Sequence, residues 1–170
     1  TDMQTLCAYA KEFLPFAPRE ARLFTTEVVR SAVGVKKLTG YAQMSQSRLC
    51  MGFRTGVVMT DPQYPAMLLA CDVLGAPSGK LFTEVREKAG LCYYCSPSLD
   101  SVKGVLVISA GIDRANRIKT QNAVMTQINA LKNGDISERE FECAKKSAAA
   151  AYREIYDSPA AIAAWYSTRD

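Results

Sequence analysis

The stretch LFTEVREKAGLCYYCSPSLDSVKGVLVISAGID, residues 81–113, decides the fold class of this chain. Its first part predicts a helix that ends at Gly90 and has one apolar face, formed by Leu81, Phe82, Val85 and Ala89. Two strands are predicted next, over residues 91–99 and 104–112, and the turn DSVKG joins them. The second strand contains GVLVISAGI, which is apolar on both faces, as is typical of a central strand. The stretch therefore predicts a helix followed by two paired strands.

One more strand and one more helix are predicted before this stretch. Residues 48–58 alternate large apolar residues with cysteine, glycine and arginine, which is the pattern of a half-buried strand. The helix that follows ends at Gly75, and we expect Asp61 to cap its start, with Pro62 in the first turn. We expect Ser78 to cap the next helix along the chain.

Two longer helices are predicted after the stretch. The first runs from Asp113 to about Asn133, and its expected inward residues are Ile118, Val124, Met125, Ile128 and Leu131. The second opens at SERE, residues 137–140, where the serine caps the helix and the glutamate three residues later completes a capping box. Its inward stripe is rich in alanine, which keeps that face flat enough for close packing.

The order of these elements indicates the architecture. Strand, helix, helix, strand, strand, helix, helix lacks the regular alternation of a doubly wound fold. We therefore predict an α+β two-layer sandwich, in which an antiparallel sheet has helices packed on one face. Before this unit, residues 1–47 predict a short amphipathic helix through about residue 14, which prolines end, and then a linker or a segment at the sheet edge.

Composition limits the class of protein. A chain of 170 residues, 48% of them hydrophobic, can form one globular domain with a sizeable core. A formal net charge of +4 without a basic block does not favour a nucleic-acid partner, and no stretch is apolar and long enough to predict membrane insertion. The six cysteines lie mostly within apolar patterns, so we expect free thiols in a reducing compartment, the cytoplasm.

Several common chemistries are disfavoured. The chain has no histidine, which excludes a Ser–His or Cys–His nucleophile pair. Cys92 and Cys95 form a C-x-x-C pair, but residues three apart in a strand point to opposite faces, so we expect the sulfurs to diverge and bind no metal. In GAPSGK, residues 75–80, three residues instead of four separate the glycines, so an ordinary turn is favoured over a nucleotide-binding loop.

Arg86 and Tyr93 are the remaining candidates. Because the chain reverses at Gly90, both side chains are expected at one end of the unit. A guanidinium and a phenol both donate hydrogen bonds, and together they can hold a carbonyl oxygen as it gains negative charge. The alternative is that Arg86 pairs with Glu87, Glu84 or a helix-end carbonyl, and that Tyr93 is buried at the sheet edge. Spacing alone leaves both readings open.

From about Arg48 to Tyr156 the chain resembles a known family, the pitrilysin and insulinase zinc peptidases, which are relatives of mitochondrial processing peptidase. The resemblance is to their C-terminal, non-zinc-binding domain. Its most specific element is R-x-x-x-x-G-L-x-Y, which Arg86, Gly90, Leu91 and Tyr93 satisfy. The resemblance implies that Arg86 and Tyr93 grip the substrate backbone and stabilise the oxyanion, opposite a zinc ion held elsewhere.

The resemblance also implies what this chain lacks. The H-x-x-E-H zinc motif of the family is absent, so we expect the isolated chain to be inactive and to bind no cofactor. Zinc is expected in a homologous partner domain or subunit, and a peptide is the expected substrate. Residues 48–170 would then be the zinc-free peptidase-family domain, truncated at both ends relative to a longer parent protein. The alternative is a structural or interaction subunit of the same fold without a peptidase role.

Overall fold

The computed structural model describes residues 2–15, 17, 20 and 26–167 of the chain. The strands are β1 (Ser47–Arg54), β2 (Tyr94–Asp100) and β3 (Val105–Ile112). The α-helices are α1 (Met3–Phe13), α2 (Tyr64–Gly75), α3 (Arg117–Lys132), α4 (Glu138–Glu154) and α5 (Pro159–Ser167). A π-helix, η1 (Leu81–Lys88), lies between α2 and β2. Two short 3₁₀ helices complete the list: η2 (Arg114–Asn116) directly precedes α3, and η3 (Ile155–Asp157) directly follows α4. Within the described part of the chain, no helix is both long and apolar enough to cross a bilayer.

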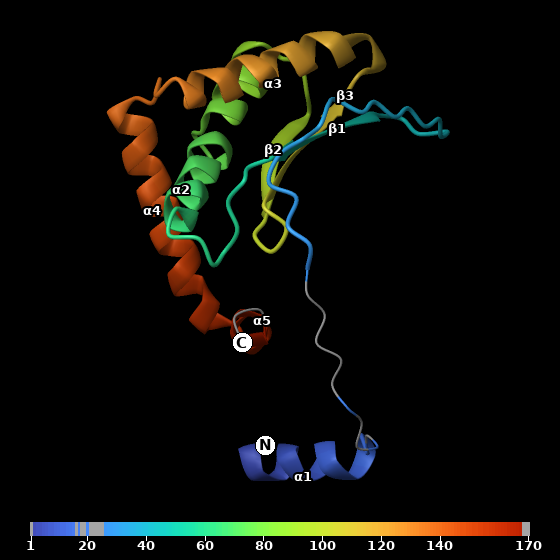
Figure 1. Cartoon of the computed structure of the whole chain (residues 1–170), viewed down its shortest axis with the longest axis vertical. Helices are drawn as coiled ribbons and strands as arrows, with labels where there is room; N and C mark the ends of the chain where they lie inside the picture. Colours follow the sequence, from blue (N-terminus) through green and yellow to red (C-terminus); the bar gives the residue numbers. More distant parts are fainter. Residues whose placement is uncertain (1, 16, 18–19, 21–25, 168–170) are drawn as a thin grey trace.

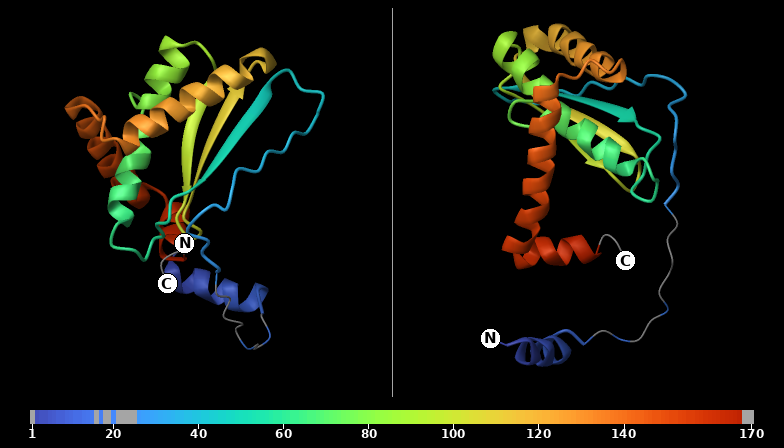
Figure 2. Two further views of the ribbon diagram at one scale, coloured as in Figure 1. Left: turned by 45° about the horizontal axis from the view of Figure 1, so that its top comes forward. Right: turned by 90° about the vertical axis from the view of Figure 1, so that its left-hand side faces the viewer.

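The strands form one antiparallel sheet in the order β1-β3-β2, with β3 in the centre as its apolar sequence predicts. Helices α2, α3 and α4 lie on one side of this sheet (Figures 1 and 2). The covered face of β3 carries Leu106 and Ile108, which pack with Leu74 of α2, Val85 of η1 and Val124 of α3. The α+β sandwich with helices on one face is therefore confirmed. We call the other side of the sheet the open face; it is formed by Arg48, Cys50, Gly52, Arg54, Tyr94, Ser96, Ser98, Asp100, Val105, Val107, Ser109 and Gly111.

Three local predictions are wrong. Asp61 does not cap α2, which starts after Gln63, because Pro65 takes the first-turn position and the Asp61 carboxylate instead accepts a hydrogen bond from the Val58 N–H at 2.9 Å. Ser78 makes no side-chain cap; η1 starts after Lys80, and the Ser78 carbonyl accepts a hydrogen bond from Thr83 Oγ1.

The third error concerns the inward face of α3. Ile118 is half exposed, and Thr120 is fully buried in its place. The Thr120 hydroxyl lies 2.9 Å from the carbonyl of Asn116 and 3.3 Å from that of Leu91, so burial leaves it hydrogen-bonded. A threonine can therefore lie on the inward face that the periodicity assigned to isoleucine.

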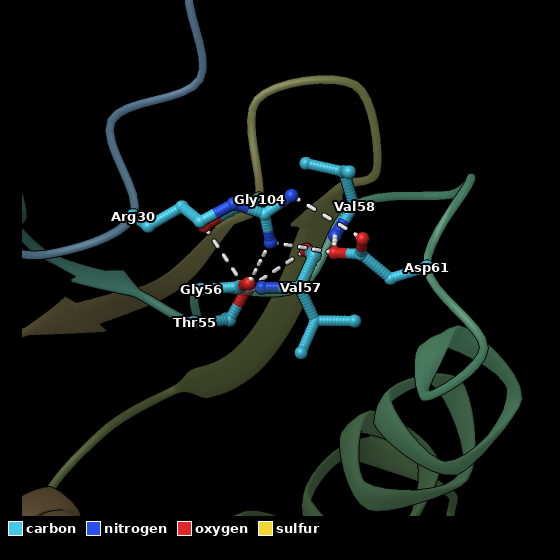
Figure 3. Close-up of polar contacts among 7 residues, drawn as sticks. All are labelled: Arg30, Thr55, Gly56, Val57, Val58, Asp61 and Gly104. Carbon is cyan, nitrogen blue, oxygen red and sulfur yellow. Dashed lines mark hydrogen bonds and ion pairs between the residues drawn. The ribbon is translucent and has the colours of Figure 1, made fainter.

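The N-terminal segment contains α1 and an extended stretch over residues 26–46. The predicted helix is confirmed, with the Asp2 side chain as its cap, but none of its residues is buried. Arg30 ties the extended stretch to the loop after β1: its Nη1 donates to the Gly56 carbonyl at 2.6 Å and to Asp61 Oδ2 at 2.7 Å (Figure 3). The Asp61 carboxylate thus joins the N-terminal segment to the sheet domain.

Candidate functional site

Arg86 lies in the last turn of η1, and its side chain is 42% exposed. Its guanidinium carbon lies 4.9 Å from the centre of the Phe82 ring, one turn earlier, which is a cation–π distance. Its Nε lies 3.7 Å from Glu87 Oε1, so the pairing with Glu87 that spacing suggested is present. An exposed pair of this kind is weak and leaves the guanidinium donors accessible to a ligand.

Tyr93 immediately precedes β2, and its N–H donates to the Gly111 carbonyl of β3 at 2.8 Å. Its side chain is not buried at the sheet edge: Tyr93 is 51% exposed. The hydroxyl donates to Asp113 Oδ1 at 2.9 Å. This hydrogen bond, and then the charge of Asp113, raise the pKa of Tyr93, so the phenol stays protonated at neutral pH.

The turn between the two residues has the predicted form. Gly90 has φ +60°, a conformation that favours glycine, and its N–H donates to the Arg86 carbonyl. Burial raises the pKa of the Cys92 thiol, and the Arg86 charge, a smaller effect, opposes this rise. The guanidinium is thus close enough to act on the residue beside Tyr93, but the two side chains have separate partners, Glu87 for Arg86 and Asp113 for Tyr93.

Cys92 and Cys95 lie closer together than the strand geometry predicted. β2 begins at Tyr94, so Cys92 lies outside the strand, and both cysteine side chains pack against the core. Burial raises the pKa of Cys95 to about 12, which makes its thiol a poor nucleophile and metal ligand. Zinc does not fit these residues: the chain has no histidine, and the described residues contain no cluster of three cysteine or carboxylate side chains that could hold a metal.

The lysine of GAPSGK has a structural partner that the sequence did not indicate. Lys80 is buried, and its Nζ lies 3.1 Å from Glu140 Oε1 at the start of α4. Glu140 Oε2 accepts hydrogen bonds from the Ser137 backbone and hydroxyl, which confirms the predicted capping box. A Cβ on Gly79 would lie 2.8 Å from two carbonyl oxygens of α2, so this glycine permits close packing. The GAPSGK loop therefore connects α2 to η1, and its lysine forms an ion pair with Glu140.

A second arginine lies at the same end of the sheet as Tyr93, and sequence reasoning missed it. Arg48 of β1, Gly111 of β3 and Tyr94 of β2 are neighbours in the strand register. Arg48 Nε donates to the Tyr94 hydroxyl at 3.2 Å, across the central strand. No local signal predicts this contact, because it joins residues 46 positions apart in the chain.

Comparisons with known proteins identify a family model and two similar proteins. The family model described as the peptidase M16 inactive domain matches residues 7–148. The chain is similar to the probable inactive metalloprotease YmfF of Bacillus subtilis (strain 168), with 36% identity over 107 residues that cover 62% of this chain and 25% of that protein. It is also similar to the uncharacterized zinc protease YmxG of the same strain, with 28% identity over 133 residues that cover 77% of this chain and 32% of that protein.

Among solved structures, the chain is similar to a conserved protein from Enterococcus faecalis V583. The TM-score is 0.82 at 28% identity, and the match covers 99% of this chain and 40% of that one. The chain thus spans between a quarter and two fifths of the length of these three proteins.

Proposed function

The chain belongs to the family of peptidase M16 inactive domains, and from this premise we propose that it is the substrate-binding, zinc-free half of an inverzincin-type metallopeptidase. Zinc and the general base come from another domain of the same polypeptide or from a partner subunit. The peptide lies between the two halves, with its backbone held by Arg86 and Tyr93. In this proposal the isolated chain binds peptides and does not cleave them.

The observation that carries this proposal is the exposure of two donor side chains on either side of one turn. The Arg86 side chain is 42% exposed, and the whole Tyr93 residue is 51% exposed, so a ligand can reach both. The guanidinium keeps free N–H groups beyond its long contact with Glu87. A peptide carbonyl is a suitable acceptor for such donors.

Tyr93 adds a dependence on charge. A phenol has one hydrogen, and here it is donated to the Asp113 carboxylate. A neutral substrate carbonyl competes poorly with a carboxylate for this hydrogen, whereas an oxyanion carries comparable charge and competes well. The hydroxyl would therefore turn to the substrate mainly when negative charge develops on it, which favours the transition state over the bound substrate.

The test uses a complete, zinc-containing assembly of the parent protein or the parent with its partner. Tyr93→Phe should lower the turnover of peptide cleavage on the order of a hundredfold, which is the usual effect of losing one oxyanion donor. Tyr156→Phe is the matched control, because Tyr156 is 77% exposed and lies at η3, away from Arg86 and Tyr93 in the chain. Wild-type cleavage by Tyr93→Phe would show that the catalytic role is wrong.

A structural or interaction subunit is the second candidate. It is favoured by the existing partners of both side chains, because Glu87 and Asp113 already occupy Arg86 and Tyr93 without a substrate. Only the peptidase function requires a zinc-binding half. An H-x-x-E-H motif in the parent protein or in the product of a neighbouring gene would therefore support the peptidase function. An assay of the full-length parent, with and without that neighbour, in zinc and then in chelator, separates them directly.

A further inference from the structure

We propose that Arg48 is a carboxylate-binding residue on the open face and selects peptides that carry a carboxylate near the segment held by Arg86 and Tyr93. This inference rests on the proposed function, because it names the class of peptide that the domain binds. The carboxylate can belong to an acidic side chain or to the peptide C-terminus, since both present the same pair of oxygens.

The first support is the way in which Tyr94 fixes Arg48. The Tyr94 ring lies directly over Gly111 of the central strand: a Cβ at Gly111 would lie 2.5 Å from its Cε1 and 2.8 Å from its Cδ1. Only glycine leaves this space, and the ring thereby reaches across β3 to accept a hydrogen bond from Arg48 Nε at 3.2 Å. The contact orients the guanidinium before any ligand binds.

The second support is the part of the guanidinium that stays available. Tyr94 takes only Nε, and the two terminal nitrogens form the fork that matches a carboxylate in a bidentate pair. Across the described residues, no carboxylate lies within ion-pair distance of Arg48. Asp113, the acidic residue at this end of the sheet, is engaged by Tyr93, and Asp100 lies at the opposite end.

The third support is the position of Arg48 relative to Tyr93. The Gly111 carbonyl accepts the Tyr93 N–H, and Gly111 is also the register partner of Arg48. Both residues are thus tied to one residue of β3. Beyond Arg48 the open face continues with small side chains, including Cys50 with Ser109 in the next row, so an extended chain can approach the sheet closely.

The experiment measures binding of dansyl-labelled peptides to this chain by fluorescence anisotropy at low salt. Three peptides share one sequence and differ only in carboxylates: an internal glutamate with an amidated C-terminus, glutamine with a free C-terminus, and glutamine with an amidated C-terminus. Wild type should bind at least one carboxylate peptide about tenfold more tightly than the peptide without a carboxylate, as expected for a charge-assisted pair. The preferred form identifies the source of the carboxylate.

Arg48→Ala should bind all three peptides equally. Tyr94→Phe keeps the ring over Gly111 but removes the acceptor for Nε, so the preference should fall to about threefold. Arg54→Ala is the matched control, because Arg54 is an exposed arginine on the same strand and the same face, at the other end of the register. It should keep the wild-type preference.

Three results would overturn the inference: wild type without a carboxylate preference or without binding, a preference that survives Arg48→Ala, or an equal loss in Arg54→Ala. Failure of the proposed function looks different. If Arg86→Ala binds all three peptides as wild type does while the Arg48-dependent preference persists, the backbone grip by Arg86 is wrong and the carboxylate site stands. Weaker binding of all three peptides by Arg86→Ala supports the grip, whereas Tyr93→Phe is expected to change turnover of the complete assembly more than peptide binding.

Discussion

Replacing Glu140 with glutamine should destabilise the domain more than replacing its ion-pair partner Lys80 with methionine. The Lys80 side chain is 8% exposed and that of Glu140 is 20% exposed. Glutamine keeps the capping box with Ser137 but leaves the buried ammonium without its counter-charge. Methionine keeps the packing of the lysine stem and removes the charge, and Glu140 retains the hydrogen bonds from Ser137.

The magnitudes follow from this asymmetry. Removing one partner of a fully buried pair costs about 3–5 kcal/mol of unfolding free energy, and the partial exposure of Glu140 reduces this figure. We expect about 3 kcal/mol for Glu140→Gln and about 1 kcal/mol for Lys80→Met, with the double variant less destabilised than the sum. Urea denaturation followed by circular dichroism measures all three. Lys145→Met is the control, because Lys145 forms an exposed pair with Glu142 on the same helix.

The pH dependence gives a second check of the same pair. Burial alone would raise the pKa of Glu140, but the hydrogen bonds from Ser137 and the charge of Lys80 outweigh it and lower the pKa. A depressed folded-state pKa stabilises the protein above the usual glutamate range, and this contribution is lost as pH falls through the folded pKa. The deficit of Glu140→Gln should therefore shrink in acid. A deficit at pH 7 no larger than that of Lys145→Met would refute the reasoning.

Three further outcomes are expected. Gly79→Ala should cost about 1–3 kcal/mol in thermal unfolding, since its Cβ would meet two rigid backbone carbonyls, whereas Gly34→Ala, with open space around it, should cost far less. Leu74→Ala should cost about 3–5 kcal/mol in urea unfolding, because Leu74 is fully buried in the core. The difference between the absorbance titrations of wild type and Tyr93→Phe reports the ionisation of Tyr93. It should give a pKa for Tyr93 above the usual tyrosine range, and Asp113→Asn should lower that pKa. Because the folded-state pKa is raised, the stability that Tyr93 contributes should be present below its usual pKa and lost as pH rises through the raised value.

Features encoded by neighbouring residues were predictable from the sequence. The capping box at Ser137 depends on a residue three positions away, and the positive φ of Gly90 is a local requirement of its turn. The central place of β3 follows from its own apolar composition. For the candidate site, the sequence left open an alternative in which Tyr93 is buried and Arg86 pairs with a neighbouring glutamate. Tyr93 is exposed, which contradicts the first part of that alternative, and Arg86 contacts Glu87, which agrees with the second.

Features that depend on distant residues were not predictable. Lys80 meets Glu140 only after α4 has folded back beside α2, and the flat Tyr94 ring over Gly111 requires the register of two strand pairs. Asp61 has the sequence of a helix cap, but its carboxylate serves Val58 and Arg30, which no short-range pattern reveals. Each of these cases is a polar group whose partner is chosen by tertiary structure.

Residues on the covered face of the sheet are constrained by the stability of the core, whereas residues on the open face are not. Substitutions at Leu106 or Ile108 change packing and are limited by stability, whereas exposed positions such as Ser96 and Ser98 meet few neighbours. Homologous domains can therefore acquire different ligand preferences by changing the open face while the helices and the core remain the same. Gly111 is the exception, because any larger residue there would displace the Tyr94 ring. A substitution at Gly111 would therefore also change the geometry of Tyr94.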